Sequence, residues 1–248
     1  GGPSFYFVSR HLQTSDAPDT AKLFAPIRPW RAANDTRCMH HDSTPPLSHS
    51  LVDVCQLLRM SLPLQTDLDP HQFQHRSLKP GQAIYRMGQP FEALYVVNAG
   101  FLKTVLFDGE GNERVAAFPM RGDLLGCDGI SLDCHASEVV ALSQCELIVL
   151  PFHKLLTLGH ACKELEHLIF RLISRQVVHE QAHLVTLSSL RSDARVAHFL
   201  NMQAANHAAL RFSPLSFRLR MTRREIGSYL GLTLETVSRT MSALDSAG

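Results

Sequence analysis

The sequence feature that most constrains the fold lies near the C-terminus, where residues 221–239 predict two short helices joined by a tight turn. Thr222 precedes Glu225 by three residues, which is the spacing of a capping box at a helix start. Gly231 supplies the permissive backbone of the turn, and Thr233 is suited to cap the second helix. Apolar residues are spaced to form one small core between the helices: Ile226, Leu230, Leu232, Val237 and Met241. The pattern predicts a helix-turn-helix, whose second helix lies in a DNA major groove.

Three polar residues of the second helix, Glu235, Ser238 and Arg239, share one face because they stand at i, i+3 and i+4. A carboxylate accepts from a cytosine amine, a guanidinium forks onto a guanine edge, and a hydroxyl serves base or phosphate. The alternative is a solvated face with a chance Glu–Arg pair, but two caps and two glycines frame this segment and favour DNA binding. Four further residues are expected to contact DNA beside them: Thr222, Arg223, Thr233 and Thr236.

These residues resemble the DNA-binding motif of the cyclic-AMP receptor protein/FNR (CRP/FNR) family of bacterial regulators, most closely in its FNR branch. The resemblance extends over roughly residues 77–248. It implies that Glu235, Ser238 and Arg239 contact TTGA-type half-sites of palindromic DNA. It also implies a cytoplasmic homodimer that regulates transcription, with double-stranded DNA and RNA polymerase as partners. Activation is the expected mode, with repression as the alternative, depending on the polymerase-facing loops and the promoter geometry. The loop from Phe107 to Arg114 is one candidate for facing the polymerase.

The charge distribution agrees with a DNA-facing C-terminal part. The chain is nearly neutral, at +1, yet after Leu190 it carries eight Arg and no Lys against four acids. No apolar run is long enough to span a bilayer, and the start lacks the pattern of a signal peptide. The six Cys are scattered, so free thiols in a cytoplasmic protein without membrane contact are expected.

Four segments are predicted. Residues 1–48 are interrupted by Pro and rich in polar residues, so a disordered N-terminal extension is expected. Residues 49–160 form a sensor domain, residues 161–190 a dimerisation helix, and residues 191–248 the DNA-binding domain. Because the chain lacks an initiator Met and ends at Gly248, we expect a fragment. The two-stranded wing that the family places after the second helix would then be truncated, which would weaken DNA binding.

The sensor segment shows short apolar runs divided by turns such as Lys79-Pro80-Gly81, a pattern typical of an antiparallel barrel or jelly roll. The string Leu94-Tyr95-Val96-Val97-Asn98-Ala99-Gly100-Phe101-Leu102-Lys103 resembles the family's strand-turn-strand. Gly122-Asp123-Leu124-Leu125-Gly126 resembles its G-D-x-x-G turn. Both imply the family's double-stranded β-helix, so the expected fold class is α+β with a C-terminal winged helix-turn-helix.

The helix predicted over residues 161–190 carries a long apolar stripe, more than a small barrel can cover, and a parallel helix of a second subunit could cover it. Intramolecular packing is the alternative. The expected dimer contacts are Leu165, Leu168, Leu172, Val177, Glu180 and Leu184. Glu180, close to its symmetry mate, would oppose pairing at neutral pH.

No cofactor is predicted. A cyclic phosphate needs a cation, but no Arg or Lys lies between Arg121 and Lys154, and Ser137 stands where nucleotide-binding relatives carry Arg.

An iron–sulfur cluster needs several thiolates. Cys55 remains of the family's closely spaced set, with Val52 and Ser61 at the places of two others. Cys145 lies near the barrel cysteine's position but three residues away from it. Haem is disfavoured because His40, His41, His71 and His75 lie in polar surroundings. A thiol-based redox response, or no ligand at all, remains the default.

Two other classes compete with the regulator. A cupin-type barrel enzyme would need an H-x-H pair with further ligands on facing strands, whereas Asp128, His135 and His153 are scattered. A ligand-binding module related to cyclic-nucleotide sensors but without DNA binding would not need the motif from Thr222 to Arg239. The sequence therefore predicts a regulator and not an enzyme.

Overall fold

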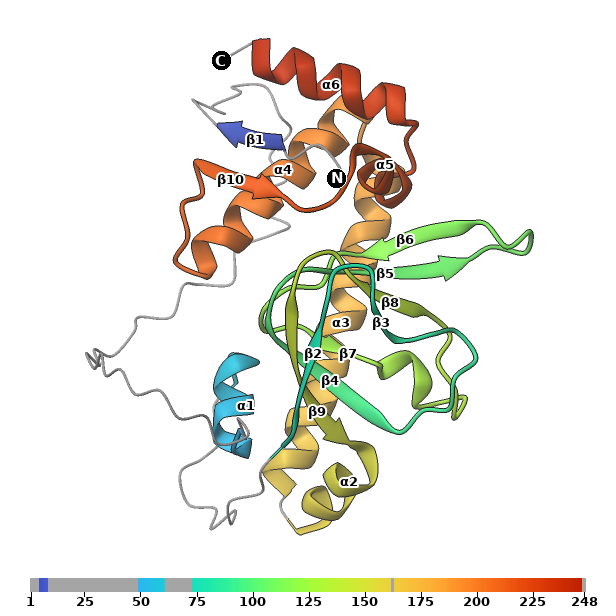
Figure 1. Ribbon diagram of the computed structural model, residues 1–248, viewed down its shortest axis with the longest axis vertical. Coiled ribbons are helices and arrows are strands. Elements are labelled where there is room, and N and C mark those ends of the chain that lie inside the picture. Colours follow the sequence, from blue (N-terminus) through green and yellow to red (C-terminus); the bar gives the residue numbers. More distant parts are fainter. Residues whose placement is uncertain (1–4, 9–48, 61–72, 162, 247–248) are drawn as a thin grey trace.

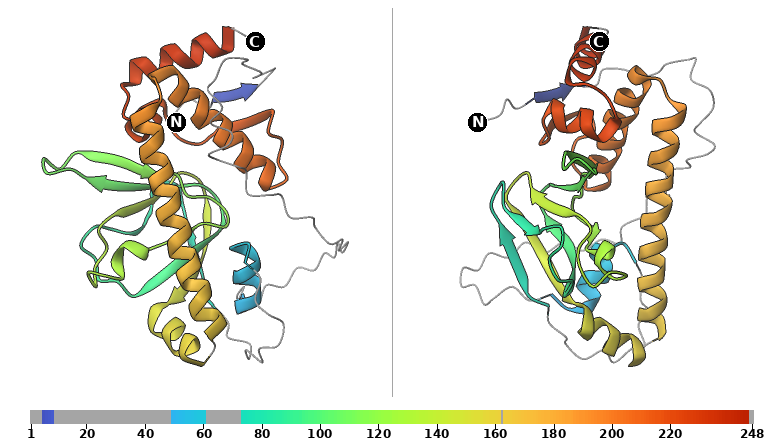
Figure 2. Two further views of the ribbon diagram at one scale, coloured as in Figure 1. Left: turned by 180° about the vertical axis from the view of Figure 1, so that it is seen from behind. Right: turned by 90° about the vertical axis from the view of Figure 1, so that its right-hand side faces the viewer.

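The computed structural model describes residues 5–8, 49–60, 73–161 and 163–246. Helix α3 (Lys163–Ser189) runs along the molecule, with a β-roll on one side and a helical domain at its C-terminal end (Figures 1 and 2). Of the helices in these ranges, none combines the length and hydropathy that a bilayer crossing requires.

The β-roll consists of two four-stranded antiparallel sheets, with strand orders β2-β9-β4-β7 and β3-β8-β5-β6. The strands are β2 (His75–Leu78), β3 (Ala83–Tyr85), β4 (Ala93–Ala99), β5 (Leu102–Phe107), β6 (Glu113–Ala117), β7 (Leu124–Leu125), β8 (Glu138–Ala141) and β9 (Cys145–Pro151). Val97, Leu102 and Val139 of the two sheets face one another in a fully buried interior. This confirms the double-stranded β-helix and the mixed fold class.

The turn between β4 and β5 requires glycine. Gly100 has φ +97°, and a Cβ there would lie 2.5 Å from both the Cys145 sulfur and the Gln144 carbonyl oxygen. Only a residue without a side chain fits this approach of two backbones, so the glycine of the family-like string is explained by geometry.

Helix α1 (Leu51–Leu57) starts at a capping box formed by Ser50 and Asp53. It ends at Leu57, because the chain leaves helical geometry at Leu58 and Arg59 has φ +56°. Helix α2 (Phe152–Ala161) follows β9 directly, in a part of the chain for which no helix was predicted from the sequence.

The N-terminal half of α3 packs inside the chain. Leu165, Leu168 and Leu172 belong to the core cluster formed with α1, and are 1%, 6% and 5% exposed. The prediction that they face a second subunit is therefore wrong, because α1 and the β-roll already cover them. The C-terminal half differs, since several of its large apolar side chains are exposed: Val177, Val178, Leu184 and Val185.

The C-terminal domain comprises α4 (Ser192–Ala209), β10 (Ser216–Leu219), α5 (Arg223–Leu230) and α6 (Leu234–Ser246). Its core gathers buried apolar side chains of all four: Val196, Phe199, Leu200, Phe217, Leu219, Ile226, Leu230 and Val237. Strand β1 (Phe5–Val8) pairs antiparallel with β10, with Phe5 opposite Leu219. Within the N-terminal extension, expected to be mostly disordered, Phe5–Val8 thus forms a strand, because the open edge of β10 offers backbone partners. The rest of that segment lies outside the described residues.

Candidate nucleic-acid interface

Helix α5 starts at the predicted capping box. The Glu225 N–H donates to Thr222 Oγ1 at 3.2 Å, and the Thr222 N–H donates to Glu225 Oε2 at 2.7 Å. Two of the donors that a helix start leaves unpaired are thereby satisfied. Burial alone would raise the pKa of Glu225, but hydrogen bonds from Thr222 and Lys103 outweigh it and hold the pKa below its usual value.

The turn between the two helices is closely packed. Gly231 ends α5 in the left-handed region, at φ +63° and ψ +36°. Gly227 lies under the turn, where an added Cβ would stand 2.7 Å from the Leu232 carbonyl oxygen. The Leu232 N–H donates to the Gly227 carbonyl oxygen at 2.8 Å. The two glycines thus fix how α6 leaves α5.

Helix α6 is preceded by Thr233, whose Oγ1 accepts from the Thr236 N–H at 3.2 Å. The two threonine hydroxyls lie 3.0 Å apart. Val237 points into the domain core and is fully buried. A capped start and a buried residue in the first turn together set the rotation of α6 about its own axis.

That rotation places the predicted polar edge outward. Glu235 and Arg239 are exposed, and Ser238 is half-buried. We call these three side chains the α6 edge. A carboxylate, a hydroxyl and a guanidinium are thereby gathered on one accessible face of a helix, which suits contact with base edges in a major groove.

The other predicted DNA contacts divide into two kinds. The hydroxyls of Thr222 and Thr233 serve the two helix starts, so their first role is structural. Thr236 and Arg223 are half-buried. Arg224, which the motif analysis passed over, is exposed at the start of α5, where a cation can meet a phosphate. Its place in the first turn, close to the helix cap, is the sequence signal that could have identified it.

The sensor domain does not fit a cyclic nucleotide. Asp128 Oδ2 accepts from the Ser137 N–H at 2.9 Å and from Ser137 Oγ at 2.7 Å. The buried His135 ring stacks on Tyr85 with centroids 3.6 Å apart, and its Nδ1 lies 3.5 Å from Asp128 Oδ1. A carboxylate and two rings of the chain itself fill the region after the G-D-x-x-G turn. A phosphate there would meet the Asp128 carboxylate, and the nearby cation of Arg86 lies 3.9 Å from Glu138 with its side chain 70% exposed.

The described cysteines do not form a ligand set. Cys55 belongs to the core beneath α1, whereas Cys145 lies in the interior of the β-roll. In the metal-free chain, burial raises the pKa of Cys55 to about 11 and that of Cys127 to about 12. Within the ranges that the structure describes, no three His, Cys, Asp or Glu side chains converge as metal ligands would. These residues therefore do not fit a thiolate-held cluster.

Comparison with protein families matches both domains. Residues 75–161 match the cyclic nucleotide-binding domain, which corresponds to the β-roll and α2. Residues 194–248 match the Crp-like helix-turn-helix domain, which corresponds to most of α4, β10, α5 and α6.

Individual relatives agree with this assignment. The chain is 33% identical over 199 residues to the transcriptional activator protein Anr of Pseudomonas aeruginosa, covering 80% of this chain and 82% of that protein. It is 34% identical over 166 residues to the fumarate and nitrate reduction regulatory protein of Vibrio cholerae, covering 67% and 66%. The structure of FixK2 from Bradyrhizobium japonicum superposes with a TM-score of 0.62 at 26% identity, over 71% of this chain and 86% of that one. The α6 edge, the β-roll and these relatives establish that the chain belongs to the FNR branch of the CRP/FNR family of transcription regulators.

Proposed function

We propose that the protein activates transcription as a homodimer that binds two-fold symmetric DNA sites with TTGA-type half-sites. The α6 edge carries this proposal, because Glu235, Ser238 and Arg239 offer the acceptor, hydroxyl and bidentate donor that such a half-site would engage. The activating role rests on the printed name of the relative Anr, a transcriptional activator. RNA polymerase is the expected second partner, the cytoplasm the expected location, and no catalytic activity is assigned.

The exposed part of α3 supports the homodimer. Phe170, Val177 and Leu184 are spaced by seven residues and are 61%, 46% and 63% exposed. A heptad spacing of apolar residues favours a parallel helix pair. We call these three side chains the α3 stripe. A partner helix would cover them and place the two α6 edges on successive major grooves, about 34 Å apart.

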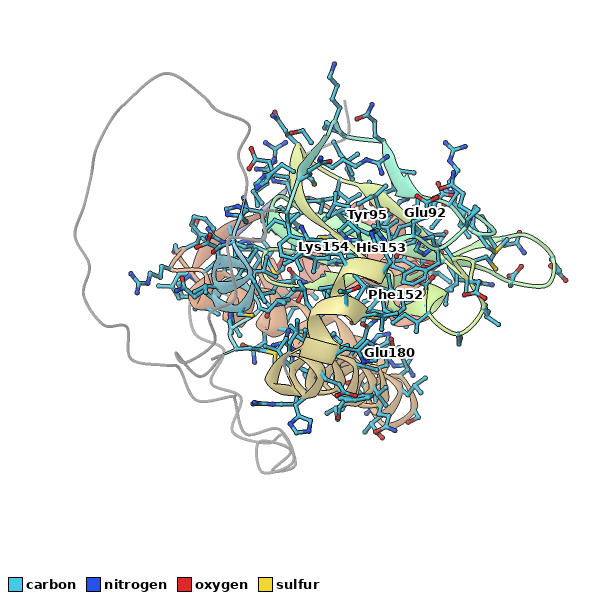
Figure 3. The ribbon with its side chains drawn as sticks, turned by 90° about the horizontal axis from the view of Figure 1, so that it is seen from below. Glu92, Tyr95, Phe152, His153, Lys154 and Glu180 are labelled. Atoms are coloured by element: carbon cyan, nitrogen blue, oxygen red, sulfur yellow. The ribbon has the colours of Figure 1, made fainter. Side chains whose placement is uncertain are left out.

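Glu180 lies on the same half of α3, where it accepts from Gln176 Nε2 at 3.3 Å. Figure 3, which looks along α3, shows the helix on one side of the β-roll with Glu180 on it. An exposed carboxylate beside the α3 stripe is expected to approach its own copy in a dimer, which would weaken the pairing.

We also propose that the regulator acts without cyclic nucleotide, haem or an iron–sulfur cluster. The Asp128 carboxylate, held by Ser137, opposes a cyclic phosphate, and the separation of Cys55 and Cys145 into two different cores opposes a cluster. An absorption spectrum of anaerobically purified protein, with iron and sulfide assays, tests this part. Visible absorption with stoichiometric iron would contradict it.

The central test is DNA binding by fluorescence anisotropy, with a TTGA-N6-TCAA duplex compared with a duplex of shuffled sequence. Arg239→Ala removes one bidentate base contact and is expected to cost about 1–3 kcal/mol, which is about 5- to 150-fold in the dissociation constant. Arg86→Ala is the matched control, because it removes an exposed arginine of the sensor domain. Equal binding of both duplexes by the unaltered protein would refute the proposed function.

A further inference from the structure

The β-roll is joined to the first helix of the DNA-binding motif by a half-buried ion pair. Lys103 Nζ on β5 lies 3.0 Å from Glu225 Oε1 on α5, and each side chain is 17% exposed. The other oxygen of the same carboxylate, Oε2, accepts from the Thr222 N–H and Oγ1 at 2.7 and 2.9 Å. One carboxylate therefore both caps α5 and binds a lysine of the sensor domain. The only other acid that the structure places near Lys103 in the described residues is Glu113, at 3.9 Å.

A second contact lies one turn further along α5. The Val115 N–H of β6 donates to Ser228 Oγ at 2.9 Å. Next to it, the Phe118 ring packs against Tyr229 with centroids 5.3 Å apart. Strand β6 and helix α5 thus lie side by side, as Figure 1 shows. Because the two polar contacts hold successive turns of α5, they fix the direction of the helix axis as well as its position.

Helices α3 and α4 also hold the C-terminal end of α5. His183 Nε2 on α3 lies 3.1 Å from the Tyr229 carbonyl oxygen, and the two rings stack at 4.1 Å. Arg195 Nη1 on α4 donates to the Leu230 carbonyl oxygen at 3.1 Å. Because Gly227 fixes the exit of α6 from α5, any rotation of α5 is passed on to the α6 edge.

We propose that Lys103 is a positioning residue for DNA binding: its ion pair with Glu225 sets the orientation of the α6 edge relative to α3. Lys103 itself contacts the carboxylate that caps α5 and not the α6 edge. Without the lysine, Glu225 would remain half-buried with an unpaired charge, and a contact that keeps α5 against β6 would be lost. This inference rests on the proposed homodimer, since orientation relative to α3 matters when two half-sites must be bound together.

The test separates orientation from recognition. Lys103→Met keeps most of the apolar stem and removes the charge, whereas Lys103→Arg keeps a cation. Lys79→Met is the matched control, at an exposed turn of the same domain. We expect Lys103→Met to weaken binding to a duplex with two half-sites by at least about fivefold, with binding to a single half-site unchanged. Lys103→Arg should restore most of the loss, and Lys79→Met should behave as the unaltered protein.

A second readout does not depend on DNA. Amide hydrogen exchange at Val115, which donates to Ser228, should accelerate in Lys103→Met and return toward normal in Lys103→Arg. Ser228→Ala should accelerate it independently. The positioning role is refuted if Lys103→Met leaves exchange and two-site binding unchanged, or if it weakens one-site and two-site binding equally. If the unaltered protein shows no sequence preference, the proposed function fails, whereas the exchange measurement still decides whether Lys103 holds α5 in place.

Discussion

Replacing Gly227 by alanine tests whether the close approach of the two DNA-binding helices is essential. The new Cβ would stand 2.7 Å from the Leu232 carbonyl oxygen and 3.5 Å from the Thr233 carbonyl carbon, where ordinary van der Waals contact begins at 3.4 Å. Both neighbours are backbone atoms of the turn, so no flexible side chain can move aside. The turn must open, and with it the angle between α5 and α6.

Two opposing effects determine how much Gly227→Ala changes the free energy of unfolding. Alanine is favoured over glycine inside a helix by about 1 kcal/mol, whereas overpacking a closely packed site costs about 1–3 kcal/mol. Because the clash is with backbone, we expect a cost at the upper end of that range, which exceeds the gain and leaves a net loss of up to about 2 kcal/mol. The opened angle should also weaken binding to the TTGA-N6-TCAA duplex.

Gly159 in α2 provides the matched control. A Cβ there would meet nothing within 4 Å, so Gly159→Ala should stabilise the chain by about 1 kcal/mol. Urea unfolding followed by circular dichroism gives both stabilities, and fluorescence anisotropy gives the affinities. The reasoning is refuted if Gly227→Ala is as stable as Gly159→Ala and binds DNA like the unaltered protein.

Two further predictions concern charge. Glu180→Ala should tighten the monomer–dimer equilibrium by about fivefold at neutral pH, because two facing carboxylates no longer repel; an unchanged constant in sedimentation equilibrium would exclude Glu180 from the interface. Burial lowers the pKa of His183 below its ordinary 6.5, and the hydrogen bond to Tyr229 opposes this only in part. The folded state therefore binds fewer protons than the unfolded state, so this contribution to stability is complete above pH 6.5 and is lost as pH falls from there through the lowered pKa. His183→Gln should reduce the difference in unfolding free energy between about pH 7.5 and about pH 5.5, and an equal difference in both proteins would contradict this.

The DNA-binding motif was predictable because its signals are local. A capping box spans four residues, a left-handed turn needs one glycine, and residues at i, i+3 and i+4 of a helix share a face whatever surrounds it. Thr222, Gly231 and the α6 edge could therefore be identified from the sequence. The general pattern of the β-roll was predictable for the same reason, since short apolar runs divided by turn residues indicate antiparallel strands.

Which apolar surface is covered, and by what, was decided only by the tertiary structure. The spacing of Leu165, Leu168 and Leu172 shows a stripe on α3, but a stripe does not specify its partner, and α1 with the β-roll covers these leucines within the chain. The pairing of β1 with β10 and the ion pair of Lys103 with Glu225 join residues far apart in sequence. Such contacts depend on how whole elements pack, because periodicity along a chain reports the face of an element and not its neighbour.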